Sequence, residues 1–146
     1  MERHDVSGQL QPMLVELTDL ALTAKQAHWN VRGQSFRPLH AQLDELADEV
    51  RHWSDEVAER LASIGIAADA RVETVAQHTP FATFPAGFVE STKVVAWIVE
   101  RLDEVIENSL PRIDHLGDLD LRSQELLVAL SARLEKHKWM FAAQQP

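Results

Sequence analysis

The chain has 146 residues, of which 45% are hydrophobic and 25% charged, a balance typical of a soluble globular protein with one core. It contains no cysteine, which excludes disulfides, thiolate metal sites and cysteine nucleophiles. The formal charge of −9 opposes binding to nucleic acid, since neither end of the chain carries a basic tail.

No segment has the composition of a signal peptide or a membrane span. The apolar stretch over residues 13–24 carries Glu16 and Asp19 at helical spacing. No repeat, linker or low-complexity segment divides the chain. We therefore expect residues 1–146 to form a single domain of a cytoplasmic protein.

The first half of the chain predicts a helical hairpin. A stripe of leucine and alanine predicts a helix over residues 7–32, which Gly33 ends. Ser35 can cap a second helix, whose apolar stripe continues to residue 64 and stops at Gly65. The two helices are joined by a short turn and should pack side by side.

A polar connection over residues 65–87 follows, with a short helix predicted near residues 72–78. The next apolar stripe predicts a third long helix over residues 88–116. Pro111 lies inside it, so we expect a kink or an early end at that point.

The last long helix is predicted over residues 121–142, with Asp120 as its N-cap. No strand is expected. Two helical hairpins joined by one long connection give an all-α four-helix bundle with a single crossover that carries a short helix, as in ferritin-like folds.

Five side chains with metal-binding chemistry follow one another around the first turn. They are His28, His40, Asp44, Asp55 and Glu59. His40 and Asp44 are four residues apart, as are the last two acids, so each pair faces a common point. Asp44 and Asp55 are separated by roughly 16.5 Å along a helix axis, whereas metal–ligand bonds are about 2.0–2.6 Å long. One subunit therefore holds two half-sites and cannot close a complete site.

The two half-sites are complementary. His28 and His40 lie at equal distances from the turn, so they should stand at one level, with Asp44 one helical turn away. Antiparallel pairing across a two-fold axis would bring these residues against the two remaining acids of a partner. Such a mixture of imidazoles and carboxylates suits ferrous iron, manganese or zinc. Each residue taken singly fits a solvated face or a half-buried histidine, but the combined spacing predicts a shared metal site.

A longer set of residues carries a family resemblance over positions 25–65. It consists of the run KQAHWNVRG at 25–33, Phe36, Leu39-His40, Leu43-Asp44-Glu45, Asp55 and Ala58-Glu59-Arg60. In residue type and in spacing, this set resembles the Dps family, the mini-ferritins named as DNA-binding proteins from starved cells.

The resemblance implies a hollow shell of twelve subunits with ferroxidase sites at the two-fold interfaces. His28, His40 and Asp44 would come from one subunit, and Asp55 and Glu59 from the next. Proteins of this family oxidise ferrous iron with hydrogen peroxide or dioxygen, store the ferric mineral and so limit oxidative damage.

Family members also carry acidic pores near the start of the last helix. The matching positions are Asp120 and Glu125, with Asp118 as a further candidate. Negative pores would draw iron inward, whereas acids at a helix N-terminus can also simply stabilise the helix dipole.

The resemblance leaves two other functions open. One is a nucleoid-associated, DNA-binding shell with incidental metal binding, although members that bind DNA use basic tails and we expect no direct DNA binding at physiological salt. The other is a zinc- or manganese-binding assembly without oxidation, because the ligand set accepts several divalent metals.

Overall fold

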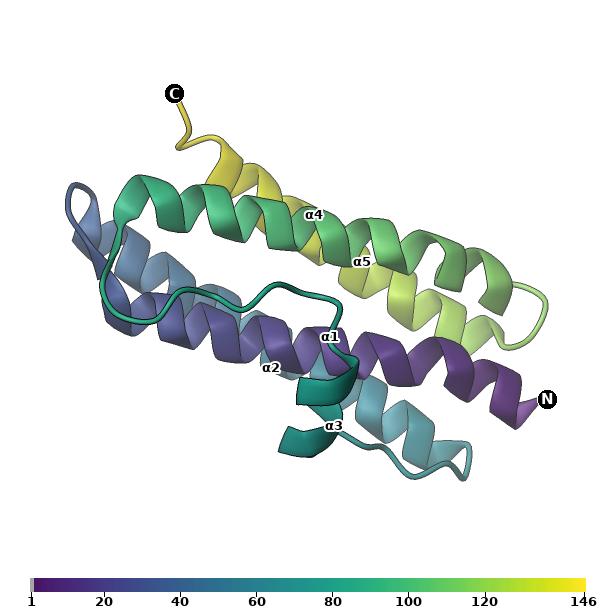
Figure 1. Ribbon diagram of the computed structural model, residues 1–146. Helices are drawn as coiled ribbons and strands as arrows, with labels where there is room; N and C mark the ends of the chain where they lie inside the picture. Colours follow the sequence, from purple (N-terminus) through teal and green to yellow (C-terminus); the bar gives the residue numbers. More distant parts are fainter. Residues whose placement is uncertain (1) are drawn as a thin grey trace.

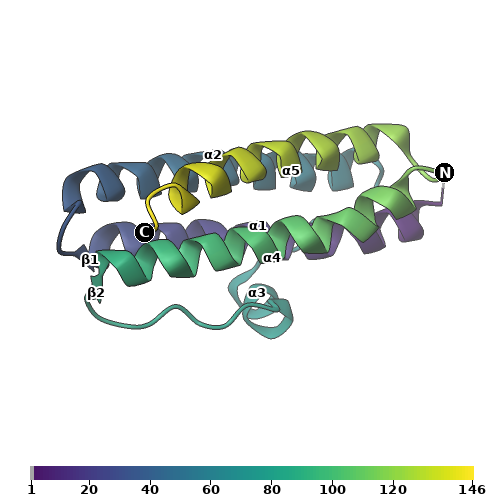
Figure 2. The same ribbon diagram turned by 90° about the horizontal axis from the view of Figure 1, so that it is seen from above.

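The computed structural model describes residues 2–146 and is dominated by five helices (Figure 1). The helices are α1 (Arg3–Asn30), α2 (Phe36–Ser63), α3 (Val72–His78), α4 (Ser91–Leu116) and α5 (Leu121–Ala142). Seen from above, α1 and α4 form one layer and α2 and α5 the other, with α3 outside the first layer (Figure 2). The predicted all-α bundle with one crossover is confirmed.

Each long helix buries one apolar stripe in the centre of the bundle. Leu17 of α1, Leu46 of α2, Leu102 of α4 and Leu130 of α5 are all fully buried in this core. Burial of a leucine side chain contributes about 2 kcal/mol, so the amphipathic pattern is the main reason these four segments are helical. None of the helices described over residues 2–146 combines the length and the apolar composition that a membrane span requires.

The connection between the first two helices is longer than the sequence suggested. Helix α1 ends at Asn30, because β1 (Val31–Arg32) pairs in parallel with β2 (Val89–Glu90) where the crossover returns. Our expectation of no strand was therefore wrong. Two residues are too few to show a strand pattern, and their partner lies far along the chain.

Two glycine-like conformations then reverse the chain into α2. Gly33 has φ of 106° and Ser35 has φ of 65°, both in the left-handed region. Ser35 occupies the predicted N-cap position, but its side chain makes no capping hydrogen bond. Glycine at position 33 is required by the backbone, since other residues rarely adopt its φ.

Helix α4 differs from its predicted range only at its start, since it ends at Leu116 as the apolar stripe indicated. It starts at Ser91 rather than residue 88, where the carboxylate of Glu90 accepts a hydrogen bond from the backbone N–H of Thr92 at 3.1 Å. It also continues through Pro111 to Leu116, so the early end was wrong. Leu116 is fully buried, and this burial holds the last turn in place despite the missing backbone donor. The bounds predicted for α3 and α5 are confirmed.

Candidate metal centre

His28 and His40 face each other across the α1–α2 hairpin. Their rings are stacked, with centroids 3.7 Å apart and planes 12° from parallel. His28 Nδ1 lies 2.6 Å from the backbone oxygen of His40, and His40 Nδ1 lies 2.7 Å from that of His28. A carbonyl oxygen can only accept, so each Nδ1 carries a proton. In the neutral rings, both Nε2 atoms therefore keep the lone pair that binds a metal.

Asp44 lies one helical turn after His40 but is paired with a cation. Its Oδ1 accepts a hydrogen bond from the ammonium of Lys25, one turn before His28 on α1. This hydrogen bond lowers the pKa of Asp44, so the carboxylate is ionised at neutral pH. Two neighbouring contacts thus join the helices of the hairpin: the hydrogen bonds from each histidine ring to the opposite backbone carbonyl, and the ion pair between Lys25 and Asp44.

Asp55 and Glu59 lie farther along α2, and both side chains are exposed. Within residues 2–146, no three histidine, aspartate or glutamate side chains are close enough to hold one ion. A single subunit thus brings the two imidazoles together and pairs the Asp44 carboxylate with Lys25. Asp55 and Glu59 are not close enough to these groups to share a metal ion with them.

Comparison with known proteins shows the family to which the chain belongs. The ferritin-like domain family matches residues 8–145. The DNA protection during starvation protein of Mycolicibacterium smegmatis is 36% identical over 142 residues, which cover 95% of this chain and 76% of the relative. The structure of Dps from Microbacterium arborescens in the high iron form is 32% identical, with a TM-score of 0.92, over 97% of this chain and 92% of that chain. This chain belongs to the Dps family.

Two further comparisons show the range of similar proteins. The Dps92 structure from Deinococcus radiodurans is 29% identical with a TM-score of 0.95, over 97% of this chain and 86% of that chain. The fine tangled pili major subunit of Haemophilus ducreyi is 36% identical over 140 residues, which are 96% of this chain and 74% of the relative. The chain is therefore similar in sequence to proteins whose names describe different tasks.

The three acids that were candidates for a pore differ from one another in their surroundings. Asp120 is buried, and its Oδ2 accepts hydrogen bonds from Arg60, at 2.6 Å, and from Ser123. Burial raises the pKa of Asp120, but the hydrogen bonds from Ser123 and Arg60 outweigh it, so the net shift is downward. Asp118 and Glu125 are exposed. Asp120 stands at the N-cap of α5 as predicted, yet its charge is balanced inside the subunit by Arg60.

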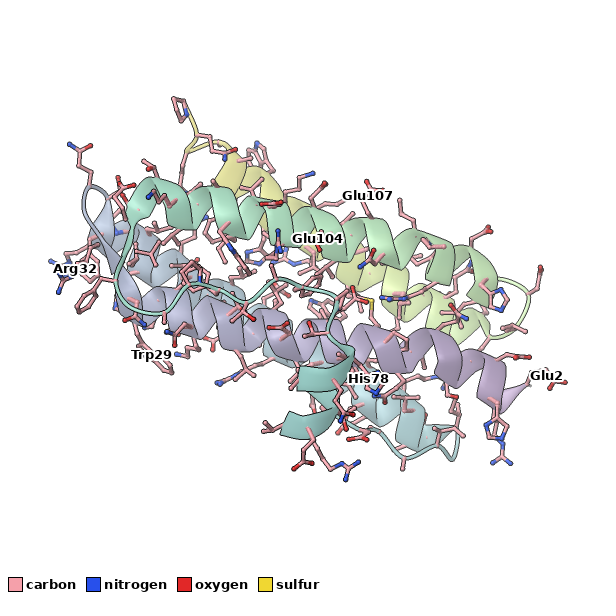
Figure 3. The ribbon with its side chains drawn as sticks, in the orientation of Figure 1. Glu2, Trp29, Arg32, His78, Glu104 and Glu107 are labelled. Carbon is pink, nitrogen blue, oxygen red and sulfur yellow. The ribbon has the colours of Figure 1, made fainter. Side chains whose placement is uncertain are left out.

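An apolar groove lies on the outer side of this Dps subunit, between α1, α3 and the crossover. Three of its lining residues are strongly exposed: Leu22 (57%), Trp29 (63%) and Val72 (83%). Trp29 projects outward from α1 (Figure 3). Exposed apolar groups gathered in a groove are typical of a surface that a protein partner covers.

Sequence reasoning missed the contact between Lys25 and Asp44. Lys25 lies three residues before His28, and that spacing places both on neighbouring turns of one helix face. The spacing was a usable signal. The partner of Lys25 could not be read from it, because Asp44 belongs to the other helix of the hairpin.

Proposed function

We propose that this Dps protein assembles into a homo-oligomer, a dodecamer, that oxidises ferrous iron and stores the ferric product. The observation that supports the proposal best is the pair of stacked imidazoles. Backbone carbonyls hold both Nδ1 protons, so two Nε2 lone pairs are available at one level of the hairpin.

Iron is the substrate in this proposal. Ferrous iron binds to His28 and His40 of one subunit, with Asp44 one turn away, while Asp55 and Glu59 of the partner subunit supply the oxygen ligands. The long separation of the two half-sites along α2 supports this division, since one chain does not close the site. The exposed α1–α3 groove supplies apolar surface for an interface between subunits.

The ligands suit a metal whose charge increases during the reaction. Carboxylates stabilise the extra positive charge of ferric iron, and neutral imidazoles keep the affinity for the ferrous ion moderate. Two ferrous ions supply the two electrons that reduce one hydrogen peroxide to water. Peroxide and ferrous iron are then consumed together, which suppresses the one-electron reaction that releases hydroxyl radical.

The test is to load the metal-free assembly with ferrous iron under anaerobic conditions, add hydrogen peroxide and follow ferric absorbance by stopped flow. We expect oxidation near two irons per peroxide, and a large loss of rate in Asp55→Ala and Glu59→Ala. Glu56→Ala is the matched control, since it removes an exposed acid from the same helix. Wild-type rates in both site variants would refute the assignment, as would oxidation no faster than that of free iron.

The competing functions make different predictions in the same experiment. A zinc- or manganese-binding assembly would bind ferrous iron without accelerating its oxidation. A DNA-binding shell would bind DNA as tightly in the Asp55→Ala and Glu59→Ala variants as in the wild type, which a gel shift on the same proteins measures.

A further inference from the structure

The ion pair between Lys25 and Asp44 is not required by the fold alone. One helical turn away, His28 and His40 already join α1 to α2 through two hydrogen bonds between their rings and the opposite backbone carbonyls. The Lys25 side chain is 22% exposed and that of Asp44 is 41% exposed, so water can reach both charged groups and replace their contact with each other. A surface pair of this kind adds little to stability, because water screens the two charges.

Its position gives the pair another consequence. Lys25 and His28 are three residues apart on α1, while His40 and Asp44 are four apart on α2. The ammonium therefore occupies the carboxylate that lies beside the two imidazoles. A divalent cation that uses Asp44 must break this contact and approach a positive charge, or must move that charge away.

Metals do not meet this obstacle equally. Ions such as Mn²⁺, which favour oxygen ligands, depend strongly on the carboxylate. Zn²⁺ forms strong bonds to imidazole, and can gain affinity from the two Nε2 atoms before Asp44 is released. Competition from Lys25 thus weakens the binding of ions that prefer oxygen ligands more than the binding of ions that prefer imidazole.

We propose that Lys25 is a specificity-determining residue of the metal site: its ammonium covers the Asp44 carboxylate and disfavours ions that do not bind imidazole strongly. This role rests on the proposed metal site at His28 and His40. Lys25 can leave without unfolding the hairpin, because its flexible stem ends in a group that is already in contact with solvent.

The test measures metal binding rather than iron oxidation. Mn²⁺ affinity is obtained from the electron paramagnetic resonance signal of the free ion, and Zn²⁺ affinity from calorimetry, both on the metal-free assembly. Lys25→Met should tighten Mn²⁺ binding roughly fivefold, the size expected for one partly exposed ion pair. Zn²⁺ binding should tighten less, so that the preference for Zn²⁺ over Mn²⁺ falls.

Matched variants separate this role from a general effect of charge. Lys25→Arg keeps the charge and should keep the preference close to that of the wild type. Lys136→Met removes an exposed charge from α5, in the other hairpin, and should leave it unchanged. In an Asp44→Asn background, Lys25→Met should produce no further gain, because the contact is already lost.

Four results would overturn the proposal. Equal gains for both metals, or the same gain in Lys136→Met, would show that Lys25 has no specific role. His40→Ala distinguishes this from failure of the site. Weaker Zn²⁺ binding in His40→Ala with no effect of Lys25→Met rejects the role of Lys25 alone, whereas unchanged Zn²⁺ binding in His40→Ala rejects the metal site and the role of Lys25 with it.

Discussion

At the scale of single residues, the candidate site is prepared by backbone rather than by other side chains. The carbonyl oxygens of His28 and His40 each bind the opposite ring, so the hairpin itself selects the tautomer that presents Nε2. Such an arrangement needs no carboxylate behind the histidines. The acids near the turn are therefore available for metal ions or, as with Asp44, for a lysine.

Glu49 shows the opposite use of an acid, as a structural acceptor between α2 and α5. It accepts hydrogen bonds from Arg133 at 2.7 Å, from Trp53 at 2.8 Å and lies 3.2 Å from His137 Nε2. Burial raises the pKa of Glu49, but hydrogen bonds from Arg133, His137 and Trp53 outweigh it and lower the pKa to about 2. A depressed pKa in the folded state stabilises the fold above the ordinary pKa of 4.5, and this stabilisation is lost as pH falls from there toward 2.

We expect Glu49→Gln to lower the thermal unfolding midpoint at pH 7 by about 5 °C. The difference from the wild type should shrink near pH 3, because Glu49 is then protonated in the unfolded chain but still mainly ionised in the folded protein, which lowers the stability of the wild type. Thermal denaturation followed by circular dichroism at the two pH values measures both effects. Glu135→Gln, at an exposed position of α5, is the control. A midpoint difference that does not depend on pH would contradict this account.

At the scale of elements, Arg60 and Asp120 connect the end of α2 to the start of α5. The pair is largely buried, with the Asp120 side chain 6% exposed. Removing one partner of a buried ion pair leaves the other charge uncompensated, which is costly. Asp120 is consequently better explained as a clamp between two helices than as a free pore acid.

Asp120→Asn should therefore destabilise the protein, with a thermal midpoint several degrees below that of the wild type. Glu125→Gln should leave the midpoint unchanged and slow the uptake of ferrous iron, if the exposed Glu125 lines a pore. Melting curves and the time course of iron uptake distinguish the two variants. A stable Asp120→Asn protein with slow uptake would restore Asp120 as a pore residue.

At the scale of the whole molecule, the proposed site depends on assembly. We expect Leu22→Glu to place a charge in the apolar α1–α3 groove and to shift the protein toward smaller species on size-exclusion chromatography. Iron oxidation should fall in parallel. Ala132→Glu adds the same charge to an exposed position of α5 and serves as the control. Full oxidation by dissociated subunits would show that a single chain suffices.

Net charge leads to a separate prediction for the whole assembly. Each chain contributes −9, so we expect no retardation of DNA by the mineral-free protein at physiological salt. A gel-shift titration across salt concentrations tests this expectation. Retardation at physiological salt that weakens as salt is added would contradict it and favour the DNA-binding function.

Local periodicity determined most of the fold, because helices depend on which residues repeat every three to four positions. The bounds of α3 and α5, the Gly33 turn and the level pairing of His28 with His40 could all be predicted in this way. Tertiary structure decided the contacts between distant segments. Strand β1 exists only because the crossover returns beside it, and α4 continues past Pro111 because its end is buried. Lys25 and Arg60 form ion pairs with Asp44 and Asp120, which lie in other segments of the chain. Such pairings depend on the relative positions of whole helices, which side-chain spacing along one helix does not contain.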